Sequence, residues 1–205
     1  MKINSAIYRG TKILTNHLIP NAYLDAEILM TKAINKDKKY ILLNSHKIIS
    51  QKHLNIFEQL IKKRSDRKPV AYITNKKFFW NSEFYVSKDT LIPRPETELI
   101  VENALKLSKQ KNNLSVLDIG IGSGCILLSI LKERKNFYGT GIDISKSCLN
   151  ISKINAINLN VCSRLKLIKS DVDKYFLGKY DLIVSNPPYI IKREINRLSS
   201  DIKNF

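Results

Sequence analysis

The hydrophobic positions of residues 1 to about 70 repeat with the period of helices, and no stretch there alternates as a strand would. Asn21 can cap one helix, whose apolar face is predicted to hold Leu24, Ile28 and Leu29. Ser50 can cap a second one, and basic residues at 62–64 suit its last turn. The pattern predicts a small helical bundle.

Aromatic residues then replace the helical pattern. Residues 78–80 and 84–86 suit two short strands around a turn at Asn81-Ser82, which predicts a β-hairpin. Pro93 and Pro95 bracket Arg94, and acidic residues and an apolar helix follow them. Prolines before a helix and acids in its first turn are ordinary helix-start chemistry, so this pattern alone favours a structural role.

From Ser115 onward, short apolar strands alternate with helices. Strands are predicted at 116–119, 137–143, 165–168 and 180–185, with helices at 125–134 and 145–158. Such alternation predicts an α/β fold with a parallel sheet and helices on its faces.

Composition excludes several classes of protein. No apolar run approaches the roughly 20 residues that span a bilayer, and no signal-peptide stretch follows Met1, so we expect a cytoplasmic chain without membrane contact. Three cysteines without CxxC spacing and three scattered histidines predict no metal site, and the thiols are expected to be buried.

The net charge of +17 raises the question of nucleic-acid binding. Lysine supplies 27 of the 35 basic residues, and the charges are dispersed, which indicates compositional bias. We therefore predict a monomer without direct nucleic-acid binding, although an anionic partner stays open.

Polar residues follow the ends of the predicted strands. The loop Gly120-Ile121-Gly122-Ser123-Gly124 allows a tight turn and close backbone approach to a ligand. Asp143, after the next strand, can accept hydrogen bonds from ribose hydroxyls, and Asp171, after the third, can receive an adenine amino group. Together they predict a nucleoside ligand at this edge.

The fourth strand delivers Asn186-Pro187-Pro188-Tyr189 to the same edge. An amide nitrogen is a poor nucleophile because its lone pair is delocalised. The Asn186 side-chain oxygen and the Pro187 carbonyl can hold both N–H groups and direct the nitrogen toward an electrophilic methyl. The prolines stiffen the loop, and Tyr189 can stack on a planar amide or base. A methyltransferase acting on a planar nitrogen is predicted.

These motifs resemble the release factor glutamine methyltransferases, the HemK/PrmC family. The resemblance rests on residues 69–74, 78–86, 91–98, 116–124 and 185–189, in order along nearly the whole chain. It implies an N-terminal helical bundle and a Rossmann-like class I S-adenosylmethionine methyltransferase domain. It also implies a helical substrate-docking domain at 1–74, a hairpin linker at 75–92 and a methyltransferase domain at 93–205.

The implied reaction is methylation of the glutamine in the Gly-Gly-Gln motif of class 1 peptide chain release factors, with S-adenosylmethionine as donor. The resemblance assigns donor binding to residues 120–124, Asp143, Asp171, Val172 and Asn186. It assigns the target glutamine to residues 186–189, with Asn186, Pro187 and Tyr189 as the catalytic set, and it makes the segment around Arg94 a substrate-binding wall.

Family members continue beyond the point where this sequence ends, at Phe205. We therefore expect a truncated domain that lacks its last strands and leaves the fourth strand as an edge. Three functions stay open: the glutamine methyltransferase, an adenine N6-methyltransferase of DNA or RNA, and an inactive remnant that only binds release factor.

Overall fold

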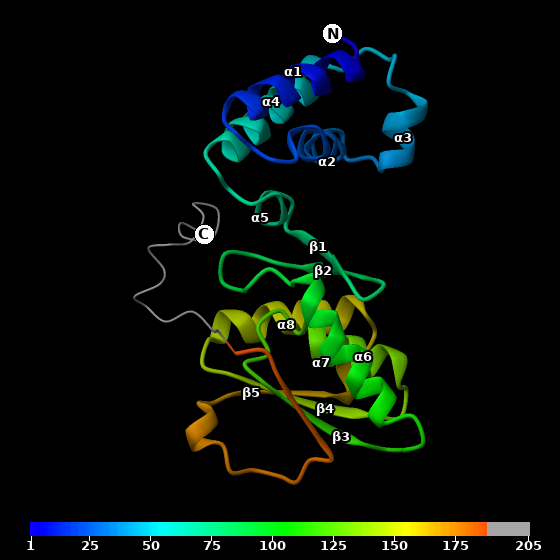
Figure 1. The fold of residues 1–205 in the computed structure, drawn as a ribbon, viewed down its shortest axis with the longest axis vertical. Coiled ribbons are helices and arrows are strands. Elements are labelled where there is room, and N and C mark those ends of the chain that lie inside the picture. Colours follow the sequence, from blue (N-terminus) through cyan, green and yellow to red (C-terminus); the bar gives the residue numbers. More distant parts are fainter. Residues whose placement is uncertain (188–205) are drawn as a thin grey trace. The chain divides into compact units, whose positions relative to one another are not determined.

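The computed structural model describes residues 1–187, which divide into two compact units. The first is Met1–Thr74, and the second begins at Asn75 (Figure 1). Each unit has its own cluster of buried apolar side chains.

The described part of the first unit is helical. Its elements are α1 (Ile3–Asn16), α2 (Ala22–Ile34), α3 (Lys38–Leu43), α4 (Gln51–Ser65) and α5 (Val70–Thr74). Helices α1, α2 and α4 pack on one another around buried Leu14, Leu29 and Phe57. The Ser50 side chain accepts a hydrogen bond from the backbone N–H of His53, so the predicted cap of α4 is confirmed.

The predicted face of α2 is wrong at Leu24, which is 47% exposed. The Asn21 side chain also makes no capping hydrogen bond. The buried face includes Asp25 instead, because the Arg64 guanidinium of α4 donates to its carboxylate at 2.8 Å. The buried face of α2 thus contains an ion-paired acid among apolar residues, and apolar periodicity alone carries no information about that pair.

The second unit opens with an antiparallel hairpin, β1 (Lys76–Phe79) and β2 (Ser82–Tyr85). Its turn is Trp80-Asn81, one residue earlier than predicted, and both residues have positive φ, at 42° and 54°. Two-residue turns of this kind match the twist of the strands that they join. Trp80 lies outside the strand because its backbone N–H donates to Glu98 and its indole N–H to Glu133.

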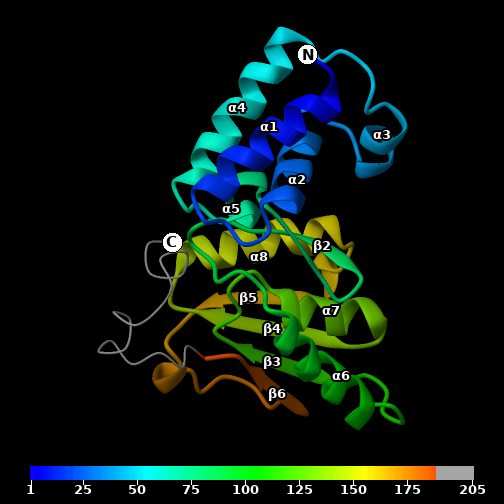
Figure 2. The same ribbon diagram turned by 45° about the horizontal axis from the view of Figure 1, so that its top comes forward.

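A parallel sheet forms the centre of the second unit and confirms the α/β prediction. Its strands lie in the order β5-β4-β3-β6, with all pairs parallel. They are β3 (Ser115–Ile119), β4 (Tyr138–Asp143), β5 (Leu165–Lys169) and β6 (Leu182–Ser185). Helices α6 (Glu98–Leu107), α7 (Cys125–Glu133) and α8 (Lys146–Asn158) lie along one face of the sheet (Figures 1 and 2).

The chain order reverses at β3. Strands β4 and β5 follow β3 on one side of the sheet, whereas β6 returns to its other side. Open α/β sheets bind ligands outside the carboxyl ends of the strands at such a reversal. Short 3-10 turns occur at η1 (Pro95–Thr97), η2 (Cys162–Arg164) and η3 (Val172–Lys174), and η1 and η3 lie near this edge.

Two further features bear on the class of protein. Across residues 1–187, every helix is too short or too polar to cross a membrane. The prediction of three buried thiols is wrong for Cys162, which is exposed in η2, because a short surface turn offers no apolar cover; Cys148 is buried and Cys125 partly so.

Candidate active site

The glycine loop joins the end of β3 to α7. The backbone N–H groups of Gly120 and Ile121 both donate to the carbonyl oxygen of Ile142 on β4, at 2.9 and 3.0 Å. Gly124 begins α7 with φ of +80°, and a Cβ built there would lie 2.7 Å from Leu128 Cδ1. A side chain at this position would be strained by the positive φ and would displace the Leu128 side chain. The loop is a tight, fixed turn at the N-terminus of a helix.

Asp143 ends β4 beside this loop. One carboxylate oxygen accepts the backbone N–H of Gly122 at 3.0 Å, and the other accepts the N–H of Ser145 at 2.8 Å. The two bonds hold the carboxylate against the loop, and each oxygen keeps capacity for a further donor. The side chain can therefore accept hydroxyl groups of a ligand that the loop cradles.

Helix α8 fixes the loop from behind with side chains that sequence analysis did not single out. Ser152 Oγ donates to the Gly122 carbonyl at 2.7 Å, and Asn155 Nδ2 donates to the Ser123 carbonyl at 2.8 Å. Asn155 is fully buried and also bonds both the N–H and the carbonyl of Tyr85 in the hairpin. Ser152 and Asn155 are polar residues among apolar ones on α8. Their hydrogen bonds to the glycine loop are visible only in the folded structure.

Asp118, the next-to-last residue of β3, is 1% exposed. Neither carboxyl oxygen has a hydrogen-bond partner among the described residues. Burial raises the pKa of this carboxyl from 3.8 to about 7; the nearby N–H of Leu127 lowers it, and the Asp143 carboxylate raises it further. A buried acid without a partner beside a ligand loop suits a cationic group of that ligand. The sequence pattern assigned Asp118 no role, because only the burial of its carboxyl in the folded structure indicates one.

Asn186 follows β6 directly. It lines a cavity of about 60 Å³ together with the loop residues Gly120–Ser123 and the segment that contains Pro93, Arg94 and Thr97. The Asn186 side-chain nitrogen donates to Thr97 Oγ1 at 3.2 Å. Three segments far apart in sequence therefore meet in one cavity at the strand-order reversal. Arg94 itself is exposed at its edge.

The other predicted residues do not line this cavity or lie outside the described range. Asp171 accepts the N–H of Asp173 in the η3 turn, and Val172 beside it is 49% exposed. Ser170, just before them, donates to the Asp143 carbonyl, which places this turn beside the end of β4. Pro187 is exposed. Pro188 and Tyr189 lie outside the described residues.

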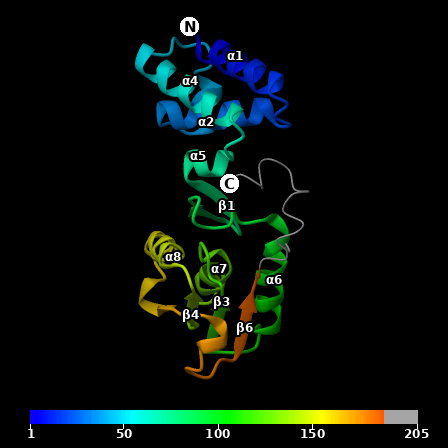
Figure 3. The same cartoon turned by 90° about the vertical axis from the view of Figure 1, so that its left-hand side faces the viewer.

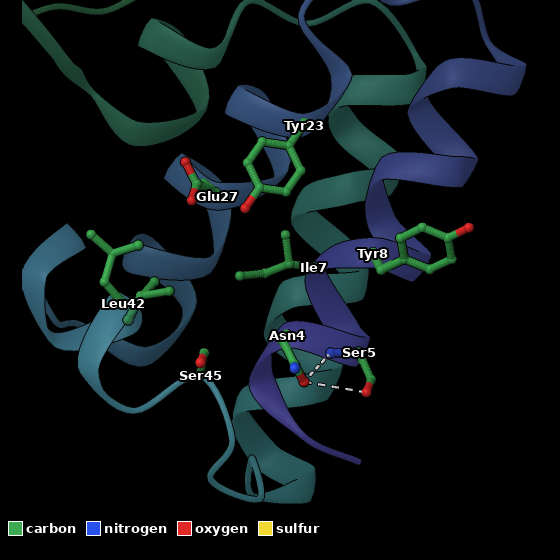
Figure 4. Close-up of a pocket in the computed structure, with 9 residues that line it drawn as sticks. Asn4, Ser5, Ile7, Tyr8, Tyr23, Glu27, Leu42 and Ser45 are labelled. Carbon is green, nitrogen blue, oxygen red and sulfur yellow. Dashed lines mark hydrogen bonds between the residues drawn. The ribbon is translucent and has the colours of Figure 1, made fainter.

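A larger cavity, of about 590 Å³, lies in the helical unit and not at the sheet (Figure 4). Tyr8, Tyr23 and Leu42 contribute exposed apolar surface around it. Glu27 lies against it, and its carboxylate is 3.0 Å from Lys38 Nζ. Burial and the Glu27 carboxylate raise the pKa of Tyr23. This cavity lacks the motif residues, so we place the candidate active site at the sheet.

Family comparisons agree with both units. A model described as the PrmC N-terminal domain matches residues 5–74, and one described as the methyltransferase small domain matches residues 95–201. The second match defines the class of the sheet unit, a methyltransferase domain.

Relatives match over the whole length of the chain. The release factor glutamine methyltransferase of Leptospira interrogans is 37% identical over 99% of this chain and 72% of its own length. Those of Clostridium acetobutylicum and Buchnera aphidicola are 35% and 36% identical, over 73% and 72% of their lengths. This chain belongs to the release factor glutamine methyltransferase family.

Solved methyltransferase structures match about half of this chain more distantly. A S-adenosylmethionine-dependent methyltransferase from Thiobacillus denitrificans, in complex with S-adenosyl-L-homocysteine, is 28% identical with a TM-score of 0.39, over 45% of this chain and 36% of that one. An RNA methyltransferase from Salinibacter ruber is 18% identical with a TM-score of 0.41, and the match covers 52% of this chain and 65% of that one.

Proposed function

We propose that the chain transfers a methyl group from S-adenosylmethionine to the side-chain amide nitrogen of the glutamine in the Gly-Gly-Gln motif of a class 1 release factor. The observation that carries the proposal is the position of Asn186, which lines one cavity with the glycine loop at the carboxyl edge of the sheet. Family membership supports the choice of a glutamine over an adenine as the target.

The residues around the loop fit S-adenosylmethionine. Residues 120–124 would approach the methionine part, the buried unpartnered carboxyl of Asp118 suits its ammonium, and Asp143 would accept the ribose hydroxyls. Asp171 and Val172, in the adjacent turn, would lie toward the adenine. When bound, this donor supplies an electrophilic methyl on a sulfonium centre.

Asn186 and Pro187 would hold the acceptor. The Asn186 oxygen and the Pro187 carbonyl each accept one hydrogen of the glutamine amide, which fixes the nitrogen and turns its lone pair toward the methyl. As the new N–C bond forms, the S–CH3 bond of the sulfonium would break and its electron pair would stay on sulfur, which leaves as the thioether S-adenosyl-L-homocysteine. The amide nitrogen, then positively charged, would release one proton to water. No general base is required, and the fixed acceptors would contribute through orientation and electrostatic preorganisation. Pro188, Tyr189 and Arg94 would complete the substrate wall.

The helical unit would hold the body of the release factor. The cavity in Figure 4 offers Tyr8, Tyr23 and Leu42, which are 73%, 58% and 60% exposed. Exposed aromatic side chains that rim a hollow are typical of protein interfaces. Tyr8→Ala combined with Leu42→Ala should raise KM for the release factor without changing the affinity for the methyl donor. An unchanged KM would show that this surface does not bind the release factor.

Incorporation of a labelled methyl group tests the proposed reaction. The purified chain is incubated with tritium-labelled S-adenosylmethionine and, separately, with release factor, release factor carrying Gln→Ala in the Gly-Gly-Gln motif, and adenine-containing DNA or RNA. Label in the unaltered factor alone supports the proposal. Label in nucleic acid indicates the adenine methyltransferase, and capture of the factor without label indicates the inactive remnant. Cytoplasmic location and a monomeric state stay predictions.

A further inference from the structure

Thr97 and Asn186 are joined by a hydrogen bond across 89 positions of sequence. Asn186 Nδ2 is the donor and Thr97 Oγ1 the acceptor, at 3.2 Å. Thr97 is 7% exposed, and it ends the η1 turn where α6 begins. Figure 3 shows α6 beside β6, which agrees with the packing between these two elements. The bond therefore links the end of β6 to the start of α6.

Thr97 is held in place independently of Asn186. Its backbone N–H donates to the Arg94 carbonyl at 3.0 Å, which closes the η1 turn, and Pro95 fixes the first φ of that turn. Val101 and Ala104, on the following turns of α6, are 0% and 3% exposed in the core of the unit. Thr97 is thus a rigid anchor, because its turn and its helix are both fixed.

The Asn186 side chain needs such an anchor. The last paired positions of β3 and β6 are Ile119 and Ser185, so Asn186 stands one residue beyond the ladder. Among residues 1–187, β3 is the strand that pairs with β6. Ser185 Oγ donates to the Ile119 carbonyl at 2.9 Å and fixes the backbone. That bond sets where the side chain starts but not the rotation of its amide.

The rotation decides whether Asn186 can bind an amide substrate. A side-chain amide has a donor end and an acceptor end, and only the oxygen can accept an N–H of the target. A hydroxyl that accepts from Nδ2 ties the donor end to α6, and the planar amide then fixes the direction of the oxygen.

We propose that Thr97 is a positioning residue that selects the productive rotamer of Asn186, with Nδ2 toward α6 and Oδ1 held as the acceptor for the target amide. This inference rests on the proposed function. It assigns the threonine of the Pro95–Thr97 turn a role separate from that of the helix start.

Three variants test the kinetic consequence. Thr97→Val keeps the shape and removes the acceptor, whereas Thr97→Ser keeps the hydroxyl. Thr90→Val removes the hydroxyl of another buried threonine of the same unit, which is 3% exposed. Thr97→Val should lower kcat about 10- to 100-fold with KM for the factor and donor affinity within about twofold, since misplacement of a positioning group costs rate. The kcat of Thr97→Ser and that of Thr90→Val should stay within about threefold of the wild-type value. Equal losses in Thr97→Val and Thr97→Ser, or none in either, would overturn the proposal.

An NMR measurement separates this inference from the proposed reaction. The side-chain NH₂ resonances of Asn186, assigned by their absence in Asn186→Ala, are recorded in the wild type and both Thr97 variants. We expect the chemical shifts of these resonances to change and their hydrogen exchange to become faster in Thr97→Val. In Thr97→Ser both should stay as in the wild type. Unchanged resonances in Thr97→Val would exclude the bond whatever the activity. A wild type without methyl transfer but with the expected NMR pattern would count against the proposed function alone.

Discussion

The Asp143 carboxylate accepts the backbone N–H of Gly122 at 3.0 Å, which joins the end of β4 to the glycine loop. Asp143→Ala removes this bond and the proposed ribose acceptor. We expect the affinity for S-adenosyl-L-homocysteine to fall at least about 10-fold, since hydrogen bonds to a charged group contribute about 1.5–3 kcal/mol each. Calorimetric titration measures it. Asp173→Ala, at an exposed position in η3, should bind like the wild type. Equal affinities in both variants would remove Asp143 from the site.

Asp118 makes stability depend on pH. Its folded-state pKa is raised from 3.8 to about 7, so the folded protein holds a proton that the unfolded chain releases between these values. The contribution of Asp118 to the free energy of unfolding should therefore be fully present below about pH 4, fall as pH rises toward 7, and level off above it. Asp118→Asn, which carries no charge, should flatten this dependence and melt higher than the wild type near pH 8 without ligand. Thermal melts across this range measure both effects, and an unchanged slope in the variant would contradict the assignment.

Gly124 should tolerate a side chain less well than Gly120. Both have positive φ, at +80° and +73°, but a Cβ at Gly124 would lie 2.7 Å from Leu128 Cδ1, whereas nothing lies within 4 Å of one at Gly120. Gly120→Ala should cost about 1–2 kcal/mol through backbone strain. Gly124→Ala should cost about 1–3 kcal/mol more through overpacking. Urea denaturation without ligand compares them, and equal losses would show that the helix accommodates the methyl.

Asn155 should matter to stability more than the exposed Asn150 of the same helix. Its side chain makes three hydrogen bonds, two to Tyr85 and one to the Ser123 carbonyl, and is 0% exposed. Asn155→Ala leaves these backbone groups buried and unpaired, so we expect a loss of about 2–4 kcal/mol. Asn150→Ala, exposed on the same helix, should change stability by less than about 0.5 kcal/mol. A small loss at Asn155 would mean that water replaces its bonds.

Sequence patterns predicted the elements well, and the contacts between them less well. The strands, α7, α8 and the glycine loop have clear local signals, because periodicity and glycine spacing report local structure directly. The buried face of α2 includes Asp25, which pairs with Arg64, and the hairpin turn includes Trp80, which donates to distant glutamates. Such contacts join residues far apart in the chain, so no local window contains them.

The same limit applies to the candidate site. Strand order explains why the glycine loop, Asp143 and Asn186 gather at one edge, and sequence analysis anticipated that edge. Thr97 was visible as part of a helix start, but its bond to Asn186 depends on how α6 packs beside β6. Asp118 was visible as an acid before the loop, but its lack of partners follows from burial. Positions along a chain indicate which groups are present, whereas their pairing is a property of the packed fold.

Residue-level mass spectrometry of the release factor shows directly whether its glutamine is methylated. The factor is incubated with S-adenosylmethionine and either the wild-type chain or Asn186→Ala, and the peptide that contains its Gly-Gly-Gln motif is sequenced by fragmentation. We expect one added methyl group on that glutamine with the wild type and none with Asn186→Ala. An unmodified glutamine with wild-type chain that binds S-adenosyl-L-homocysteine, or a methyl group on another residue, would contradict it.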